Sequence, residues 1–187
     1  MTQRSNPQAA LLPSAWVVRH AALIAPGARV LDVAAGHGRH SIFLAARGAQ
    51  VTAVDRDADA LRAFAATPGV TARVVDLEGP DWPLAGERFD AIVCVHYLYR
   101  SRLADLLSLL GDDGVLIYET FAVGNEVFGR PSNPAYLLRD GELLSLVQQR
   151  MSVVAFEQGV TARYGTKAVV QRIAAAARSA WPPPLDA

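Results

Sequence analysis

The sequence contains only one cysteine, Cys94, which excludes a disulfide framework and favours a reducing, cytoplasmic setting. Net charge is also absent, because 18 basic side chains balance 18 acidic ones. The arginines are scattered, so the charge pattern indicates neither a nucleic acid nor an anionic membrane as partner. No apolar run approaches the length that crosses a bilayer, and residues 1–8 lack the apolar segment of a signal peptide. We therefore expect a cytoplasmic protein with no membrane or nucleic-acid partner.

Apolar residues are abundant instead. They make up 51% of the 187 residues, whereas charged residues make up 19%. A chain of this length can bury one substantial core, so we expect a single domain over residues 1–187. Repeats and low-complexity segments are lacking. The prolines of Trp181-Pro182-Pro183-Pro184 cannot continue a helix or a strand, so this end is expected to be extended.

The chain alternates between short apolar segments, rich in β-branched residues, and segments with helical spacing. Continuously apolar strands are typical of a parallel sheet that helices bury on both faces. The last two strands are joined so tightly that one of them must run antiparallel. The sequence thus predicts an α/β fold with a doubly wound, Rossmann-like, mostly parallel seven-stranded sheet and an antiparallel C-terminal hairpin. The expected strands are 29–33, 50–54, 70–75, 89–95, 115–120, 152–162 and 166–175, the expected helices are 14–25, 41–47, 57–66, 102–110 and 140–147, and a turn is expected at 111–114.

The most informative stretch runs from residue 30 to residue 41. An apolar run leads into Asp32, small residues follow at alternate positions (Ala34, Gly36 and Gly38), and a helical segment comes next. Small residues let the backbone approach a ligand closely, and loop amides beside a helix N-terminus favour electron-rich groups. This strand, loop and helix indicate a site for a nucleotide-type cofactor.

Three acids, Asp32, Asp55 and Asp76, fall at the carboxyl ends of three successive strands, where doubly wound sheets bind ligands. The distance of Asp55 from the glycine loop suits an acid that binds ribose. Two features depart from a dinucleotide site: Ser41 stands where a helix-packing glycine is expected, and Asp32 would repel a pyrophosphate. The pattern favours a positively charged ligand instead.

Taken in order, these segments resemble the motifs of class I S-adenosylmethionine (SAM) dependent methyltransferases. The resemblance covers residues 30–175, with its motifs at 30–38, 54–55, 75–77 and 89–93. Ala34 departs from the family pattern, which often has glycine at that position. Residues 118–126, 128–131, 133–134 and 137–138 further resemble small bacterial methyltransferases of the tellurite-resistance type.

The resemblance implies SAM as cofactor and an in-line displacement in which alignment of the nucleophile dominates and no metal is needed. The loop after the first strand would wrap the methionine part, and Asp32 would help to hold its amino group. Asp55 would accept hydrogen bonds from both ribose hydroxyls, and Asp76 would accept from the adenine amino group. The residues assigned to the cofactor are Asp32, Ala34, Ala35, Gly36, His37, Gly38, Asp55, Arg56, Asp76, Leu77 and Val95.

The substrate side is expected at the same edge of the sheet. The resemblance implies a helical cap at residues 1–27, and the glycines and proline of residues 122–138 are typical of a lid over the substrate. Arg130 is the best candidate to hold an anionic substrate. The catalytic candidates are Glu119, Tyr97 and His96, and the substrate-binding candidates are Tyr99, Arg100, Asn125 and Arg130.

The acidic candidates have structural alternatives that the sequence leaves open. Asp32 can cap the loop amides, and Asp55 and Asp76 can form turns. Glu119 can be a catalytic base, a substrate anchor or the partner of an arginine, because a buried acid needs a partner or a function.

The histidines and the cysteine have alternatives as well. No third ligand accompanies His37 and His40, which argues against a metal, so we interpret His37 as a loop residue near the cofactor and His40 as an ordinary helix residue. Arg19 and His20 either touch the SAM carboxylate or lie on a solvated face. Cys94 is interpreted as a small core residue.

The sequence therefore predicts SAM-dependent methyl transfer to a small-molecule acceptor, with oxygen, nitrogen, sulfur or a metalloid as the methylated atom. An NAD(P)-dependent oxidoreductase and a non-catalytic SAM-binding sensor are the alternatives. Little of the chain lies beyond the core fold, which weakens the case for a macromolecular substrate.

Overall fold

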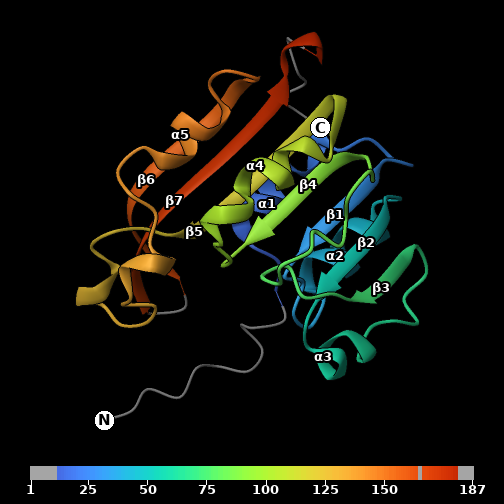
Figure 1. The fold of residues 1–187 in the computed structure, drawn as a ribbon, viewed down its shortest axis with the longest axis horizontal. Coiled ribbons are helices and arrows are strands. Elements are labelled where there is room, and N and C mark those ends of the chain that lie inside the picture. The colour runs from blue at the N-terminus through green and yellow to red at the C-terminus, as the bar shows by residue number, and fades with distance from the viewer. Residues whose placement is uncertain (1–11, 164–165, 181–187) are drawn as a thin grey trace.

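A computed structural model describes residues 12–163 and 166–180, so the predictions for residues 1–8 and 181–184 lie outside the described residues. The described part is built on a seven-stranded sheet in the order β3-β2-β1-β4-β5-β7-β6 (Figure 1). Strands β1 to β5 are parallel, whereas β7 is antiparallel to both β5 and β6, so the predicted fold class is confirmed. The strands are β1 (Arg29–Val33), β2 (Gln50–Asp55), β3 (Val70–Val74), β4 (Phe89–Val95), β5 (Leu110–Phe121), β6 (Met151–Arg163) and β7 (Thr166–Ala177).

Helices cover both faces of the sheet (Figure 1). On one face, Trp16 and Leu44 pack in a buried cluster with alternate residues of β1, β2, β4 and β5. On the other face, Leu106 and Leu143 pack against the remaining strand residues. Both faces are apolar because successive strand residues point to opposite sides. The helices are α1 (Ala15–His20), α2 (Arg39–Ala46), α3 (Ala58–Arg62), α4 (Leu103–Ser108) and α5 (Glu142–Val147).

Several predicted starting points are confirmed. The limits of β1 and β4 are those predicted from the sequence. The Ser14 hydroxyl accepts from the Trp16 amide at 3.1 Å and caps α1, at the residue where the helix over 14–25 is predicted to begin. Asp57 caps α3 by accepting from two backbone amides at 3.0 Å.

The predicted turn at 111–114 is wrong, because β5 already begins at Leu110. Phe89 pairs with Leu110 before the register between β4 and β5 shifts, so the chain continues as strand. The predicted helix 102–110 ends at Ser108 for the same reason. The helix expected from residue 140 begins at Glu142, since Gly141 takes the capping position with φ of 60°.

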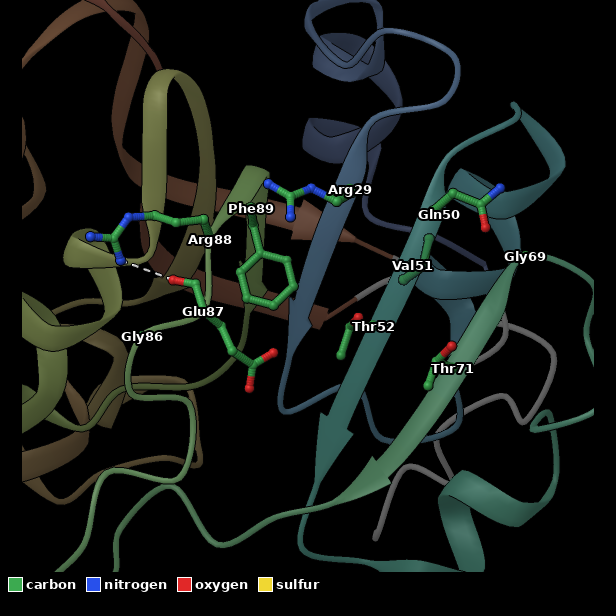
Figure 2. Close-up of a pocket in the computed structure, with 10 residues that line it drawn as sticks. All are labelled: Arg29, Gln50, Val51, Thr52, Gly69, Thr71, Gly86, Glu87, Arg88 and Phe89. Carbon is green, nitrogen blue, oxygen red and sulfur yellow. Dashed lines mark hydrogen bonds between the residues drawn. The ribbon is translucent and has the colours of Figure 1, made fainter.

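The amino ends of the parallel strands border a cavity of their own. Residues 75–88, between β3 and β4, form no helix, which leaves part of one sheet face uncovered. A cavity of about 460 Å³ lies there, at the amino ends of β1, β2 and β4 (Figure 2). Arg88 donates to the Glu87 carbonyl oxygen at its wall. This cavity lies at the edge opposite to the predicted site, so cavity size alone does not locate the site.

Candidate functional site at the carboxyl ends of the strands

The loop after β1 is held in a left-handed backbone conformation. Ala34, Gly36 and Gly38 have φ values of 53°, 54° and 74°. A Cβ atom on Gly38 would lie 2.4 Å from the ring of Phe64, whereas a Cβ on Gly36 would meet nothing within 4 Å. Gly38 therefore allows the loop to pack, and Gly36 borders open space that suits a ligand lying against the backbone. Ala34 adopts this conformation at a cost of about 1–2 kcal/mol relative to glycine.

Asp55, at the end of β2, ties the loop to the second strand. Its Oδ2 accepts from the Gly36 amide at 2.8 Å, and its Oδ1 accepts from the Asp57 amide at 2.9 Å. Asp76 similarly accepts from the Glu78 amide at 2.9 Å. Both acids thus form turns, as the structural alternative predicted, yet each carboxylate oxygen retains a second lone pair for a ligand.

The two acids share one pocket of about 190 Å³. Its wall combines acidic, apolar and aromatic side chains next to the loop after β1. An adenosine has a diol and an amino group that such acceptors can bind. The residues lining this pocket are Ala34, Asp55, Arg56, Val75, Asp76, Leu77, Glu78 and Tyr97, six of which were predicted as site residues.

Asp32 is buried in β1, with only 1% of its surface exposed. Its Oδ2 accepts from the Ser41 hydroxyl at 2.6 Å, so Ser41 holds the acid from the position where a dinucleotide motif would have glycine. Its Oδ1 is buried and has no hydrogen-bond partner within residues 12–163 and 166–180. Burial raises the pKa of Asp32 to about 6, although the Ser41 hydrogen bonds oppose the shift. A positively charged ligand would offset this loss of solvation.

His96 follows β4 and has a positive φ of 60°. Its ring stacks on Phe121 of β5, with the ring centroids 4.8 Å apart. The ring nitrogens lie between two charged groups: Nε2 is 3.9 Å from Glu119 Oε1, and Nδ1 is 3.5 Å from Arg39 Nη2. The imidazole is therefore held among α2, β4 and β5.

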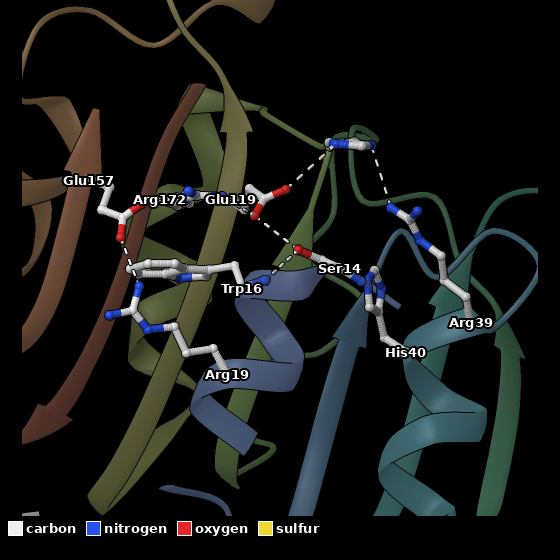
Figure 3. Close-up of polar contacts among 9 residues, drawn as sticks. Ser14, Trp16, Arg19, Arg39, His40, Glu119, Glu157 and Arg172 are labelled. Carbon is white, nitrogen blue, oxygen red and sulfur yellow. Dashed lines mark hydrogen bonds and ion pairs between the residues drawn. The ribbon is translucent and has the colours of Figure 1, made fainter. Parts of the chain in front are cut away.

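Glu119 is nearly buried at the end of β5 and has several partners (Figure 3). Its Oε2 accepts from the Ser14 hydroxyl at 2.9 Å and lies 3.8 Å from Arg172 Nη1. Arg172 also donates through Nε to Glu157 at 2.8 Å. Glu119 is thus the partner of an arginine and also faces His96.

The segment before α1 crosses this edge of the sheet. The Ser14 amide donates to His40 Nε2 at 3.1 Å, while the Ser14 hydroxyl binds Glu119 (Figure 3). Arg39 donates to the Leu12 carbonyl oxygen at 3.5 Å. The interpretation of His40 as an ordinary helix residue is wrong, because its buried ring anchors the chain in front of α1.

The expected contact of Arg19 or His20 with a SAM carboxylate is not supported. Arg19 pairs with Glu157 of β6 at 2.9 Å. His20 packs against the ring of Trp16 at 4.2 Å between centroids, so it does not lie on a solvated face either. Burial, reinforced by Arg19, lowers the pKa of His20.

Arg100 and Asn125, predicted to bind substrate, instead hydrogen-bond to residues of the segment 122–138 and its neighbours. Arg100 makes five hydrogen bonds, two to Glu142 and three to carbonyl oxygens in residues 134–137. Asn125 donates to the Pro131 carbonyl oxygen at 2.9 Å and accepts from the Val169 amide at 3.1 Å. These contacts occupy both side chains and fix the two ends of the loop.

The other substrate-side candidates lie apart from one another. Tyr97 lines the acidic pocket, and burial raises the pKa of its phenol, so the phenol stays protonated at neutral pH and is not available as a base. The Tyr99 hydroxyl donates weakly to the Glu78 carbonyl oxygen at 3.5 Å. Arg130 lines a different cavity with residues 131–133 and Tyr136.

The remaining predicted positions lie in the loop after β1, in β4 and in the core. His37 is exposed in the loop after β1, Val95 ends β4, and Ala35 packs in a small cluster with Phe64. Cys94 is fully buried, and burial raises its pKa, as expected of a core residue. Within the described ranges, no group of three His, Cys, Asp or Glu side chains is placed to hold a metal ion, and no helix is long and apolar enough to span a bilayer.

Comparison with known proteins adds to this geometry. Residues 30–113 match the family described as a methyltransferase domain. This match confirms the predicted resemblance over residues 30–113. A stretch of 86 residues is 36% identical to an uncharacterized protein of Mycobacterium tuberculosis. That stretch covers 44% of this chain, and the chain spans about a third of the relative's length, 31%.

Solved structures share the fold over most of this chain. TehB from Haemophilus influenzae has a TM-score of 0.75 at 18% identity, over 89% of this chain and 63% of that one. The 1,6-didemethyltoxoflavin-N1-methyltransferase of Burkholderia thailandensis, with bound 1,6-didemethyltoxoflavin and S-adenosylhomocysteine, has a TM-score of 0.64 at 24% identity, over 90% and 78%. NodS, an N-methyltransferase from Bradyrhizobium japonicum, was solved with S-adenosylhomocysteine and gives 0.62 at 15% identity, over 85% and 82%. At these sequence identities, the similarity to the solved structures shows a shared fold alone.

Proposed function

We propose that this chain transfers a methyl group from SAM to a small-molecule acceptor. The observation that carries the proposal is the placement of Asp55, which accepts the Gly36 amide and shares a pocket with Asp76. The diol and the amino group of an adenosine require acceptors of this kind. The methyltransferase domain match and the S-adenosylhomocysteine bound in two similar structures support the same conclusion.

The residues present fit SAM. Open space above Gly36 leaves room for the methionine part, and the orphaned Oδ1 of Asp32 suits a charged amino group, directly or through water. When bound, SAM supplies a methyl group that its positive sulfur already activates. The chain has to hold the donor, align the acceptor and exclude water. His37, Arg56, Leu77 and Val95 complete the proposed cofactor site.

The acceptor side is formed by two segments in this proposal. Residues 12–27 close one side of the cofactor site, through the contacts of Ser14 with Glu119 and His40. Residues 122–138 act as the lid, which Arg100 and Asn125 hold at its ends and which carries Arg130 between them. Arg100 and Asn125 thereby position the lid rather than the substrate.

Calorimetric titration of the purified protein with SAM and with NADH tests the cofactor. We expect SAM to bind and NADH to bind at least 100-fold more weakly. Tight NADH binding without SAM binding would favour an oxidoreductase. Transfer of label from methyl-labelled SAM to a panel of small molecules then separates an enzyme from a sensor, which would bind SAM and methylate nothing.

Replacing Asp55 with alanine is expected to weaken SAM binding by about 1–3 kcal/mol, because two ribose hydroxyls lose a charged acceptor. Asp55→Asn can still accept from the Gly36 amide. It therefore separates the effect of losing the charge from the effect of loosening the loop after β1. Asp57→Asn is the matched control, since this acid caps α3 two residues away. Titration calorimetry on the three variants measures the effect, and unchanged affinity in Asp55→Ala would remove Asp55 from the ribose site.

Replacing Arg130 with alanine is expected to lower turnover more than SAM affinity, because the guanidinium is proposed to hold the acceptor and not the cofactor. Arg88→Ala, at the opposite edge of the sheet, is the control for losing an arginine. Steady-state rates and calorimetry on both variants provide the comparison. Equal losses of turnover and affinity in Arg130→Ala would place this residue outside the acceptor site.

A further inference from the structure

We infer that His96 takes a proton from the acceptor during methyl transfer, and that Glu119 is the positioning residue that sets its tautomer. This inference rests on the proposed methyl transfer and narrows its substrate class. The acceptor would be a small molecule whose nucleophilic atom carries a proton at neutral pH, an N–H, O–H or S–H group. An acceptor atom that attacks through a lone pair without losing a proton would need no such base.

His96 lies where the cofactor loop and the end of β5 meet. β4 pairs with β1 on one side and with β5 on the other, so the three carboxyl ends are neighbours. Arg39, the first residue after the loop 34–38, contacts the imidazole at 3.5 Å. The side chain of His96 is 38% exposed, so a substrate can reach it, whereas Glu119 beside it is nearly buried.

The charged neighbours of the ring define its tautomer. A guanidinium only donates hydrogen bonds, so Nδ1, which faces Arg39, must be the unprotonated nitrogen of the neutral ring. A carboxylate only accepts, so the proton of Nε2 points at Glu119, 3.9 Å away. Stacking on Phe121 and the hydrogen bond from the His96 amide to the Glu119 carbonyl, 2.9 Å, hold the residue in place. Nδ1 is therefore the nitrogen that can accept a proton.

Two other groups hold the Glu119 carboxylate in place beside the ring. The Ser14 hydroxyl donates to Oε2, and Arg172 lies behind the same oxygen. Once Nδ1 takes a proton, the imidazolium faces a buried carboxylate, which stabilises the cation. Among the described residues, the charged groups with contacts to this centre include Arg39 of α2 at Nδ1, Glu119 of β5 at Nε2 and, behind Glu119, Arg172 of β7.

The proposed step is balanced in atoms and charge. The lone pair of the acceptor atom forms a bond to the methyl carbon, the carbon–sulfur bond breaks, and its electron pair stays on the sulfur. The proton of the acceptor passes to Nδ1, which gives up its long contact with Arg39. The imidazolium returns the proton to water after the products leave.

The tautomer is measured without any acceptor. The chain has four histidines, and long-range ¹H–¹⁵N spectra distinguish the tautomers of each ring, with His96→Asn assigning the signal of His96. We expect a neutral His96 protonated on Nε2, whose signal moves in Glu119→Gln and not in Glu157→Gln. Glu157 is the matched control because it also pairs with Arg172, while the carboxylate that faces the His96 ring among the described residues is that of Glu119. A His96 ring protonated on Nδ1, or a His96 signal that does not move in Glu119→Gln, would overturn the inference.

The proton transfer is measured with labelled SAM and a panel of small phenols, heteroaromatic amines and thiols. Asparagine is the suitable replacement for His96, because it tolerates a positive φ and lacks the imidazole. We expect His96→Asn to lower kcat at least 100-fold, about the minimum for a lost general base, and Glu119→Gln to lower it about 10-fold. The affinity for S-adenosylhomocysteine should change by less than about threefold in His96→Asn, and the fall in wild-type rate at acidic pH should be absent from this variant.

The two proposals fail in different ways. If S-adenosylhomocysteine does not bind the wild-type protein, or binds and no compound is methylated, the proposed function fails, and the tautomer spectra still decide the arrangement of His96 and Glu119. If methyl transfer occurs and His96→Asn keeps wild-type kcat, the proposed function stands and His96 is not the base. Methyl transfer to dimethyl sulfide, which has no proton to lose, should be equal in wild type and His96→Asn, and a 100-fold loss there would likewise contradict the role of a base.

Discussion

Replacing Gly38 with alanine is expected to lower the free energy of unfolding by about 3 kcal/mol and to abolish SAM binding. The residue has φ of 74°, which costs an alanine about 1–2 kcal/mol. Its new Cβ would also lie 2.4 Å from the buried ring of Phe64, and overpacking of this kind adds about 1–3 kcal/mol. Urea unfolding and titration calorimetry measure the two effects, and wild-type stability would show that Phe64 has room to move.

Gly36 offers the matched control two residues earlier. Its φ is 54°, so alanine suffers similar backbone strain, but the added Cβ meets nothing within 4 Å. Gly36→Ala should therefore lose only about 1–2 kcal/mol of stability. Its methyl group would enter the space proposed for the cofactor, so SAM affinity should fall at least 10-fold. Wild-type affinity in Gly36→Ala would mean that SAM does not lie against this loop.

Replacing Asp32 with asparagine is expected to stabilise the protein without ligand while weakening SAM binding. Burial raises the pKa of Asp32 from 3.8 to about 6, so the folded state binds more protons than the unfolded state between these values. Stability therefore falls as the pH rises through this window, and the loss is complete above pH 6. A shift of this size corresponds to about 3 kcal/mol. Asparagine has no charge to bury. The stability that Asp32→Asn gains over the wild type should therefore be absent near pH 4, grow as the pH rises towards 6, and be complete above pH 6.

Urea unfolding at pH 4.5, 6 and 8 measures this gain, with Asp113→Asn at an exposed position as control. Calorimetry near pH 6, in buffers of different ionisation enthalpy, provides a second measurement. If the SAM amino group comes to Asp32, binding lowers the pKa of this acid and releases protons from the wild type and not from Asp32→Asn. A gain that does not change with pH would contradict the assignment of the penalty to the buried charge.

Much of this architecture follows from local sequence. The limits of β1 and β4 were predictable because both strands are runs rich in β-branched and apolar residues, and Ser14 and Asp57 cap helices through their own side chains. The placement of Asp55 and Asp76 in one pocket follows from the rule that parallel strands end at a common edge.

Contacts between distant segments were not predictable in the same way. Ser14 and Glu119 are 105 positions apart, and only the capping pattern of Ser14 marked it at all. His40 and Arg100 have residue types that suit a site, yet other segments bind both: His40 accepts from the Ser14 amide, and Arg100 binds Glu142 and the Ala135 carbonyl oxygen. The strand pairing of Leu110 likewise overrides the turn signal of the glycines and aspartates that follow it. In each case the outcome depends on tertiary packing, which a single segment does not encode.

The central claim is that the carboxyl ends of β1 to β4 bind one adenosine-bearing methyl donor. A crystal structure of the protein with S-adenosylhomocysteine tests it most directly. We expect the ribose hydroxyls at Asp55, the adenine beside Asp76 and Leu77, and the sulfur facing His96. Density for the ligand in the cavity lined by Arg29, Thr52 and Arg88 at the opposite edge, with the pocket at Asp55 empty, would contradict it.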